Sequence, residues 1–150
     1  MIGKRKEKAM KKLLFVGVLG WISLGVAFET GRTSQGLSEL QQLGITAGVA
    51  QACGVGEKLK NFELIANRII ANPTATVEEE KKQLKEFAAY KLAAYNEQKR
   101  QPALSCQEVI RRFNDLPIFQ SIIYADGTIK LPDGRIIKPN RPLKKTKEKK

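Results

Sequence analysis

SELQQLGITAGVAQAC, residues 38–53, is the stretch that decides the fold class. Its apolar side chains recur at intervals of three and four, which is typical of a helix with one buried face. The pattern predicts a helix from Ser38 to Cys53. Gly44 and Gly48 lie four residues apart on it, and we expect them to let another helix approach closely. The apolar positions are Leu37, Leu40, Leu43, Ala47 and Ala50.

Three further helices are predicted downstream. One covers residues 57–71 and ends at Asn72-Pro73, because proline disfavours helical backbone in the residue before it. Thr76 and Glu79 have the spacing of a capping box, which opens a helix that reaches Arg100. Ser105 and Glu108 repeat this spacing at the start of a fourth helix. The inner stripe predicted for the third helix is Leu84, Phe87, Ala88, Lys91, Ala94 and Tyr95.

The periodicity changes after Pro117. Asp126-Gly127 and Asp133-Gly134 separate short β-prone runs, which predicts a β-hairpin or a three-stranded meander over residues 118–138. We therefore expect a mainly α fold, a small bundle of three to four helices over residues 37–117, with the β region attached to its C-terminal side.

The two cysteines, Cys53 and Cys106, are predicted to form a disulfide. They fall at the end of the first predicted helix and the start of the fourth, so a bond would tie the bundle together. It would close a loop of roughly 50 residues, worth about 4 kcal/mol in the chain-entropy account. A zinc site is not expected, because two cysteines without any histidine cannot supply four nitrogen or sulfur ligands.

Residues 1–28 predict export. Six basic side chains precede the apolar run LLFVGVLGWISLGVAF, residues 13–28, and Gly25 and Ala27 are small enough for a signal-peptidase site. The run is shorter than the roughly 20 residues of a membrane-spanning helix. The preferred interpretation is a cleaved signal peptide, which predicts that the mature protein is periplasmic or secreted. An uncleaved inner-membrane signal-anchor is the alternative, and Met10 is an alternative start to Met1. Residues 29–36 read as a linker.

Charge is concentrated at the two ends of the chain. The net charge is +12, of which residues 1–27 carry +5 and residues 129–150 carry +7, so the middle is balanced. We do not expect a nucleic-acid partner, because such domains carry basic side chains on folded elements. Residues 139–150 are predicted to be a disordered basic tail. At this end of the chain, the candidate contacts to an anionic lipid, a cell-wall polymer or an acidic protein face are Lys138, the last residue of the predicted β region, and Arg141, Lys144, Lys145, Lys147, Lys149 and Lys150 of the tail.

Enzymatic activity is not expected. The absence of histidine removes the commonest general base and the usual partner of a serine or cysteine nucleophile. The acidic run Glu78 to Glu80 complements the dipole of a helix start, and no cofactor motif is present. The leading hypothesis is an exported, non-enzymatic envelope protein that binds another protein, as an accessory subunit of a membrane-associated assembly. The alternatives are a soluble periplasmic chaperone or inhibitor, and a membrane-anchored protein whose basic tail binds an anionic polymer.

Overall fold

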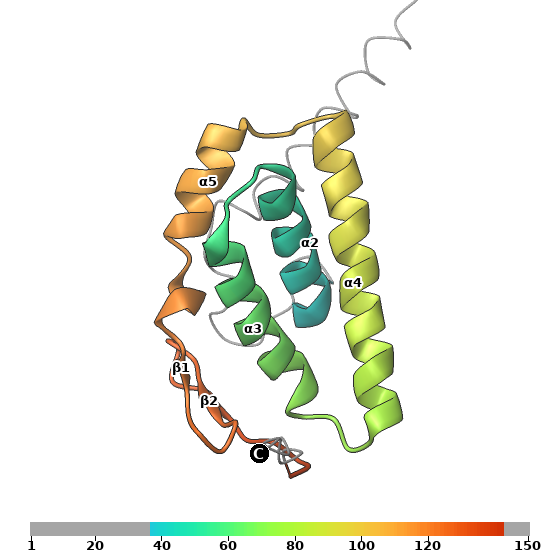
Figure 1. The fold of residues 1–150 in the computed structure, drawn as a ribbon, viewed down its shortest axis with the longest axis vertical. Coiled ribbons are helices and arrows are strands. Elements are labelled where there is room, and N and C mark those ends of the chain that lie inside the picture. Colours follow the sequence, from blue (N-terminus) through green and yellow to red (C-terminus); the bar gives the residue numbers. More distant parts are fainter. Residues whose placement is uncertain (1–36, 143–150) are drawn as a thin grey trace, which may run out of the picture.

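The computed structural model describes residues 37–142, and within them the chain forms four α-helices (Figure 1). The predicted signal peptide or anchor, the linker and the tail residues 143–150 lie outside the described residues. The helices are α2 (Glu39–Ala52), α3 (Glu57–Ala71), α4 (Val77–Arg100) and α5 (Cys106–Asn114). The four helices predicted from the sequence are confirmed.

A small sheet follows the helices. A short 3₁₀ helix, Pro117–Gln120, leads into three antiparallel strands in the order β1-β2-β3. The register pairs Ile123 with Ile129 and Ile129 with Ile137. Ile129 is fully buried, so this row faces the bundle, and the predicted meander is confirmed. The strands are β1 (Ile122–Ile123), β2 (Ile129–Lys130) and β3 (Ile136–Ile137).

The closest packing is between α2 and α4. A Cβ atom added to Gly44 would lie 2.8 Å from the Tyr90 Cβ, and one added to Gly48 would lie 2.9 Å from the Ala94 Cβ. Both glycines therefore permit a helix approach that any side chain would obstruct, as the sequence predicted. The predicted inner stripe of α4 is wrong at Ala88, which is exposed, because α2 contacts α4 over a narrower face than the stripe assumed.

The core lies between all four helices and the sheet, and α4 contributes Phe87 to it. Three phenylalanines meet there: the Phe62 and Phe113 ring centroids are 5.3 Å apart, and the Phe113 and Phe119 centroids are also 5.3 Å apart. Phe62 is fully buried, and Ile118 and Leu131 are buried in the same core. The sheet is thus part of the core and not an appendage, which explains how so short a sheet is stable.

The disulfide between Cys53 and Cys106 is present, with the two Cα atoms 5.0 Å apart. It joins the end of α2 to the start of α5 at one end of the bundle (Figure 1). Gln98 of α4 packs beside it, because its Nε2 donates to the Leu104 carbonyl at 2.9 Å and lies 3.6 Å from the Cys53 sulfur. The predicted staple of the bundle is confirmed.

The predicted capping boxes form only in part. Thr76 and Ser105 accept hydrogen bonds from the backbone N–H three residues on, as predicted. The Glu79 carboxylate, however, accepts from Ala75 N, one residue before the cap, and Glu108 pairs with arginines of its own helix. A complete box instead starts α2, where Ser38 and Gln41 exchange both bonds.

Residues 139–142 are ordered against the bundle, which corrects the prediction that the disordered tail begins at Pro139. Asn140 N donates to the Asn72 carbonyl at 2.8 Å, and Asn140 Nδ2 donates to the Pro73 carbonyl at 2.6 Å. Arg141 pairs with Glu80 of α4. The physical reason is that the turn between α3 and α4 offers unpaired carbonyls, a feature that composition does not reveal.

Candidate functional site

The outer face of the sheet is the main candidate for a contact surface. The register places Ile122, Lys130 and Ile136 directly opposite one another on this face. Because side chains alternate along a strand, Tyr124 and Lys138, each two residues further on, continue it. We call these five residues the outer sheet face: Ile122, Tyr124, Lys130, Ile136 and Lys138.

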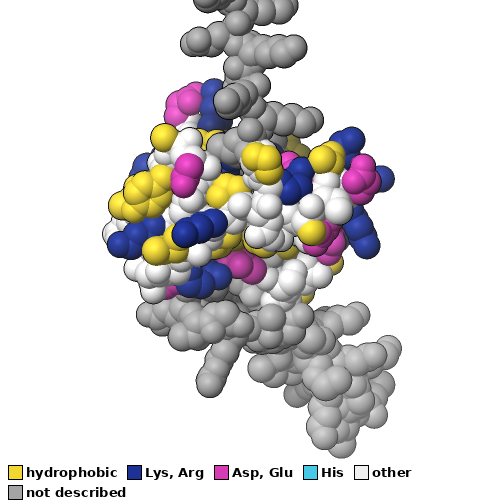
Figure 2. Space-filling view, turned by 90° about the horizontal axis from the view of Figure 1, so that it is seen from below, with side chains coloured by type: hydrophobic (Ala, Val, Ile, Leu, Met, Phe, Trp, Pro, Cys, Tyr) yellow, Lys and Arg dark blue, Asp and Glu magenta, His cyan; other side chains and the backbone are white. Residues whose placement is uncertain are grey.

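The apolar members of the outer sheet face are exposed. The relative exposures of Ile122, Tyr124 and Ile136 are 51%, 47% and 58%, and Lys130 and Lys138 are exposed as well. Large apolar side chains gathered on one rigid element are typical of surfaces that another molecule covers. Seen from below, hydrophobic, basic and acidic side chains are interspersed on the described part of the surface (Figure 2).

The two turns of the sheet are fixed by aspartates. Asp126 Oδ1 accepts a hydrogen bond from Thr128 N at 2.9 Å, and this contact lowers the pKa of Asp126. Burial opposes the ionisation of Asp133, but hydrogen bonds from the Arg135 backbone and guanidinium outweigh it and lower the pKa of Asp133. Both carboxylates are thus held charged by turn geometry, and their hydrogen bonds give them a structural role.

Arg135 ties the sheet to the start of α2. Its Nη2 lies 2.7 Å from Glu39 Oε1, and its Nε lies 2.8 Å from Asp133 Oδ2. The hydrogen bond to Glu39 raises the pKa of Arg135, and Asp133 adds to this effect against the opposing influence of burial. The outer sheet face is therefore carried on a platform that is fixed to the bundle at both Ile129 and Arg135.

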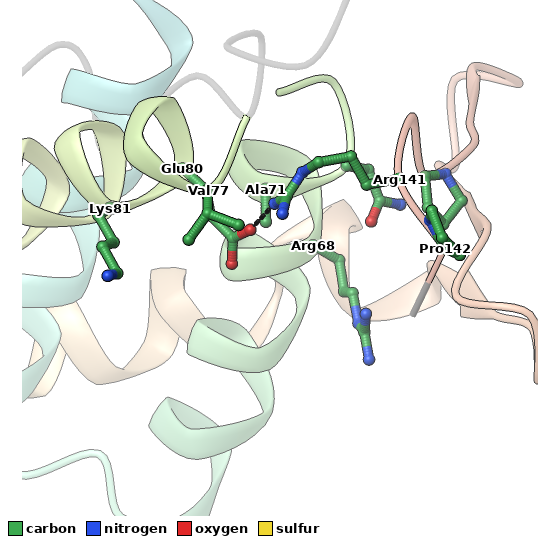
Figure 3. Close-up of a pocket in the computed structure, with 9 residues that line it drawn as sticks. Arg68, Ala71, Val77, Glu80, Lys81, Arg141 and Pro142 are labelled. Carbon is green, nitrogen blue, oxygen red and sulfur yellow. Dashed lines mark hydrogen bonds and ion pairs between the residues drawn. The ribbon is translucent and has the colours of Figure 1, made fainter. Parts of the chain in front are cut away.

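The basic residues predicted to contact an anionic partner lie in different environments. Lys138 is exposed on the outer sheet face, while Arg141 is half-buried and turned towards Glu80 (Figure 3). Lys144, Lys145, Lys147, Lys149 and Lys150 lie outside the described residues.

Sequence reasoning did not identify Ile122, Tyr124 and Ile136 as a surface. The sequence feature that could have predicted this surface is the pair of adjacent isoleucines in each of two strands, Ile122-Ile123 and Ile136-Ile137. Because neighbouring strand residues face opposite sides, such a pair puts one isoleucine on each face of the sheet. Only one face of this sheet meets the core, so the other isoleucine of each pair is left outside.

No protein-family model, curated protein or solved structure matches the chain. None of the helices within residues 37–142 has the length and apolar character needed to cross a membrane. In that same part of the chain, no three side chains of the metal-binding types are grouped closely enough to hold an ion.

Proposed function

We propose that the chain is an exported, non-enzymatic protein of the cell envelope that binds another protein through the outer sheet face. The observation that carries the proposal is the exposure of Ile122 and Ile136, at 51% and 58%, on a sheet whose opposite face is buried. Apolar side chains flanked by lysines favour a partner surface with an apolar centre and an acidic rim. An accessory subunit of a membrane-associated assembly would have such a constant partner.

Export is supported by the sequence of residues 1–28 and is compatible with the disulfide, since disulfides persist in oxidising compartments. The bond also suits a small domain whose limited core benefits from a covalent tie. A role as a soluble chaperone or inhibitor, or as an anchored protein that binds an anionic polymer, is the alternative.

Photo-crosslinking in cells tests the proposal. A photoreactive amino acid replaces Ile136 in one variant and Leu92, which is 61% exposed on α4, in the control. We expect one adduct of defined mass from position 136 and none from position 92. The substitution Ile122→Ser should reduce that adduct, because it removes a neighbouring apolar contact without touching the core.

The outcome also separates the alternatives. Many adducts of different mass from position 136 would favour a chaperone that binds many clients. Adducts from position 92 alone would contradict the assignment of the surface. If deletion of residues 143–150 abolishes retention by the envelope and Ile122→Ser does not, the anionic-polymer alternative is favoured.

A further inference from the structure

The two sulfurs of the Cys53–Cys106 disulfide belong to residues in different surroundings. The bond lies at the end of the bundle opposite the sheet (Figure 1). Cys106 is exposed, whereas Cys53 is half-buried. A thiolate that attacks a disulfide must reach one of its two sulfurs, and the rate of exchange depends on this access. Cys106 is therefore the end of the bond that another molecule reaches more easily.

A buried glutamine stands beside the other sulfur. Gln98 of α4 is only 7% exposed, and its Nε2 donates to the Leu104 carbonyl at 2.9 Å and lies 3.6 Å from Cys53 Sγ. The amide nitrogen carries two hydrogens, so it can serve the carbonyl with one and the sulfur with the other. Neutral sulfur is a weak acceptor, and hydrogen bonds to an ionised acceptor are stronger. Gln98 is thus placed to stabilise Cys53 as a thiolate when the bond breaks.

The position of Cys106 in the chain favours its reactivity. Ser105 caps α5, and Cys106 is the first residue of this nine-residue helix. The backbone N–H groups and the dipole at a helix start favour the thiolate form of a cysteine, which is its nucleophilic form. When the bond is open, Cys106 is therefore an exposed thiol that can attack a disulfide of another protein, while Cys53 is the less accessible partner.

We propose that Cys53 and Cys106 form a reversible redox site that exchanges with an exported dithiol oxidoreductase, and that Cys106 is the cysteine to which this partner bonds. Cys53 is the cysteine that leaves when the bond opens and attacks when it closes. The site lies away from the outer sheet face and does not rest on the binding function proposed above.

The exchange conserves atoms and electrons. A thiolate of the partner attacks Cys106 Sγ, and a mixed disulfide forms as the Cys53–Cys106 bond breaks. The electron pair of the broken bond goes to Cys53 Sγ, which takes a proton from water. The second thiolate of the partner then attacks the partner's own bonded sulfur and releases Cys106, which is protonated in turn. The partner dithiol is oxidised to a disulfide, and the cysteine pair gains two electrons and two protons. Oxidation of the pair is the reverse, through the same mixed disulfide.

Mapping the mixed disulfide with glutathione tests which sulfur is attacked. The oxidised full chain is treated with reduced glutathione under native conditions, and N-ethylmaleimide is added after short times to alkylate the released thiol. Peptide mass spectrometry then identifies the cysteine that carries each group. We expect glutathione on Cys106 and the maleimide on Cys53, in roughly tenfold excess over the reverse arrangement. Equal amounts, or an excess of the reverse arrangement, overturn the proposal.

The dependence on glutathione concentration shows whether the folded protein reacts. Direct attack on the native bond gives an opening rate that rises in proportion to the glutathione concentration, and this is the expected result. A bond that opens only after the domain unfolds gives a rate that levels off at the unfolding rate. The unfolding rate is measured separately in urea and extrapolated to water. A plateau at that rate overturns the proposal.

The substitution Gln98→Met tests the role of the buried amide, because it removes the N–H donors and keeps a side chain of similar length. We expect it to slow opening by about three- to tenfold, since the hydrogen bond to the leaving sulfur is only partly developed as the bond breaks. Gln107→Met is the matched control, because it makes the same change at an exposed position beside Cys106. Its opening rate should equal that of the parent.

The sign of the Gln98→Met effect separates a role in exchange from a structural one. A side chain that only braces the segment before α5 would, when removed, loosen the bond and accelerate its opening. Faster opening in Gln98→Met, or equal slowing in Gln107→Met, overturns the assignment of Gln98. Proportionality to glutathione is checked for both variants, so that opening through unfolding is not counted as exchange.

A protein probe tests the class of partner. Reduced thioredoxin with its second active-site cysteine replaced by serine is mixed with the oxidised chain, and free thiols are then alkylated. We expect an adduct of one chain with one probe, which separates on reduction and whose linking peptide contains Cys106. The absence of this adduct, or linkage through Cys53, overturns the assignment of an oxidoreductase partner at Cys106.

Discussion

Gly48 sits against the backbone of α4, and replacing it tests how tightly the two helices approach. A Cβ atom at this position would contact the Lys91 carbonyl oxygen and would lie 2.9 Å from Tyr95 N. Backbone atoms cannot move aside as a flexible side chain can. We therefore expect Gly48→Ala to lower the free energy of unfolding by about 1–3 kcal/mol, measured by urea denaturation followed by far-UV circular dichroism.

The expected sign is what makes this substitution informative. Helix propensity alone predicts that alanine in place of a mid-helix glycine stabilises by about 1 kcal/mol. Asn96→Ala, at an exposed position of α4, is the control and should be neutral or slightly stabilising. If Gly48→Ala unfolds at a higher urea concentration than the parent, this result contradicts the conclusion that α2 and α4 pack too closely at Gly48 to admit a side chain.

In α5, the carboxylate of Glu108 pairs with the side chains of two arginines. Glu108 accepts hydrogen bonds from Arg111, at 2.6 and 2.9 Å, and from Arg112. These bonds lower the pKa of Glu108 from 4.5 to about 2. A lowered pKa stabilises the fold above the unfolded-state value, and this contribution is lost as the pH falls from about 4.5 towards 2. We expect Glu108→Gln to lower the stability of the protein at pH 7. We also expect the variant to lose less stability than the parent as the pH falls from about 4.5 towards 2.

Urea midpoints at pH 7, 4 and 3 measure the effect. Glu57→Gln is the matched control, because Glu57 also pairs with a basic residue three positions along its helix, but both side chains of that pair are largely exposed. It should lower the midpoint little at any pH. Equal pH profiles for Glu108→Gln and the parent would contradict the role of the Arg111 and Arg112 contacts.

Asn140 and Arg141 contact the bundle, and two truncations test how much these contacts stabilise it. Deletion of residues 143–150 should leave the thermal midpoint unchanged. Deletion of residues 139–150 removes both Asn140 hydrogen bonds and the Arg141 pair with Glu80, and should lower the midpoint by roughly 5–10 °C. Calorimetric melting curves of the two proteins make the comparison. Identical midpoints would mean that residues 139–142 contribute no stability.

Interactions between residues close together in the sequence could be predicted from it, whereas those between residues far apart could not. Thr76 and Ser105 cap helices through bonds to residues three positions away, so local spacing was enough to predict both helix starts. Asn72 was predicted only to end a helix. Its Nδ2 also donates to the carbonyls of Gly127 and Ile137, 55 and 65 residues away, and joins α3 to the sheet. No local pattern encodes such partners.

The candidate sites show the same division. The predicted basic contacts were chosen by charge alone, which could not tell that Lys138 is exposed and that Arg141 is half-buried against Glu80. The sequence did not predict the cavity that is lined by Arg68 of α3, Lys81 of α4 and Arg141, because these three segments meet only in the folded chain. The basic residue types led to the prediction of an anionic partner. Which of these residues lie close together is decided by tertiary contacts, which the residue types do not show.

Across the domain, the Cys53–Cys106 bond links the end of α2 to the start of α5, and replacing one sulfur removes it. Its loop, with a sequence separation of 53, corresponds to a stabilisation of about 2–5 kcal/mol. Cys53→Ser should lower the free energy of unfolding by this amount in urea titrations. A reducing agent should lower the stability of the parent to the same level and leave the variant unchanged. A parent that is insensitive to reduction would contradict a structural role for the bond.

The position of this bond also governs how the domain responds to mechanical load. When the chain is pulled at residues 37 and 142, tension passes through α2, the sulfur bridge and α5, so α3 and α4 are bypassed and cannot be drawn out. Stretching single molecules with and without reduction should reveal the sheltered length, an additional extension of about 180 Å for 53 residues. The domain can thus yield at its ends under tension and keep the hairpin of α3 and α4 closed.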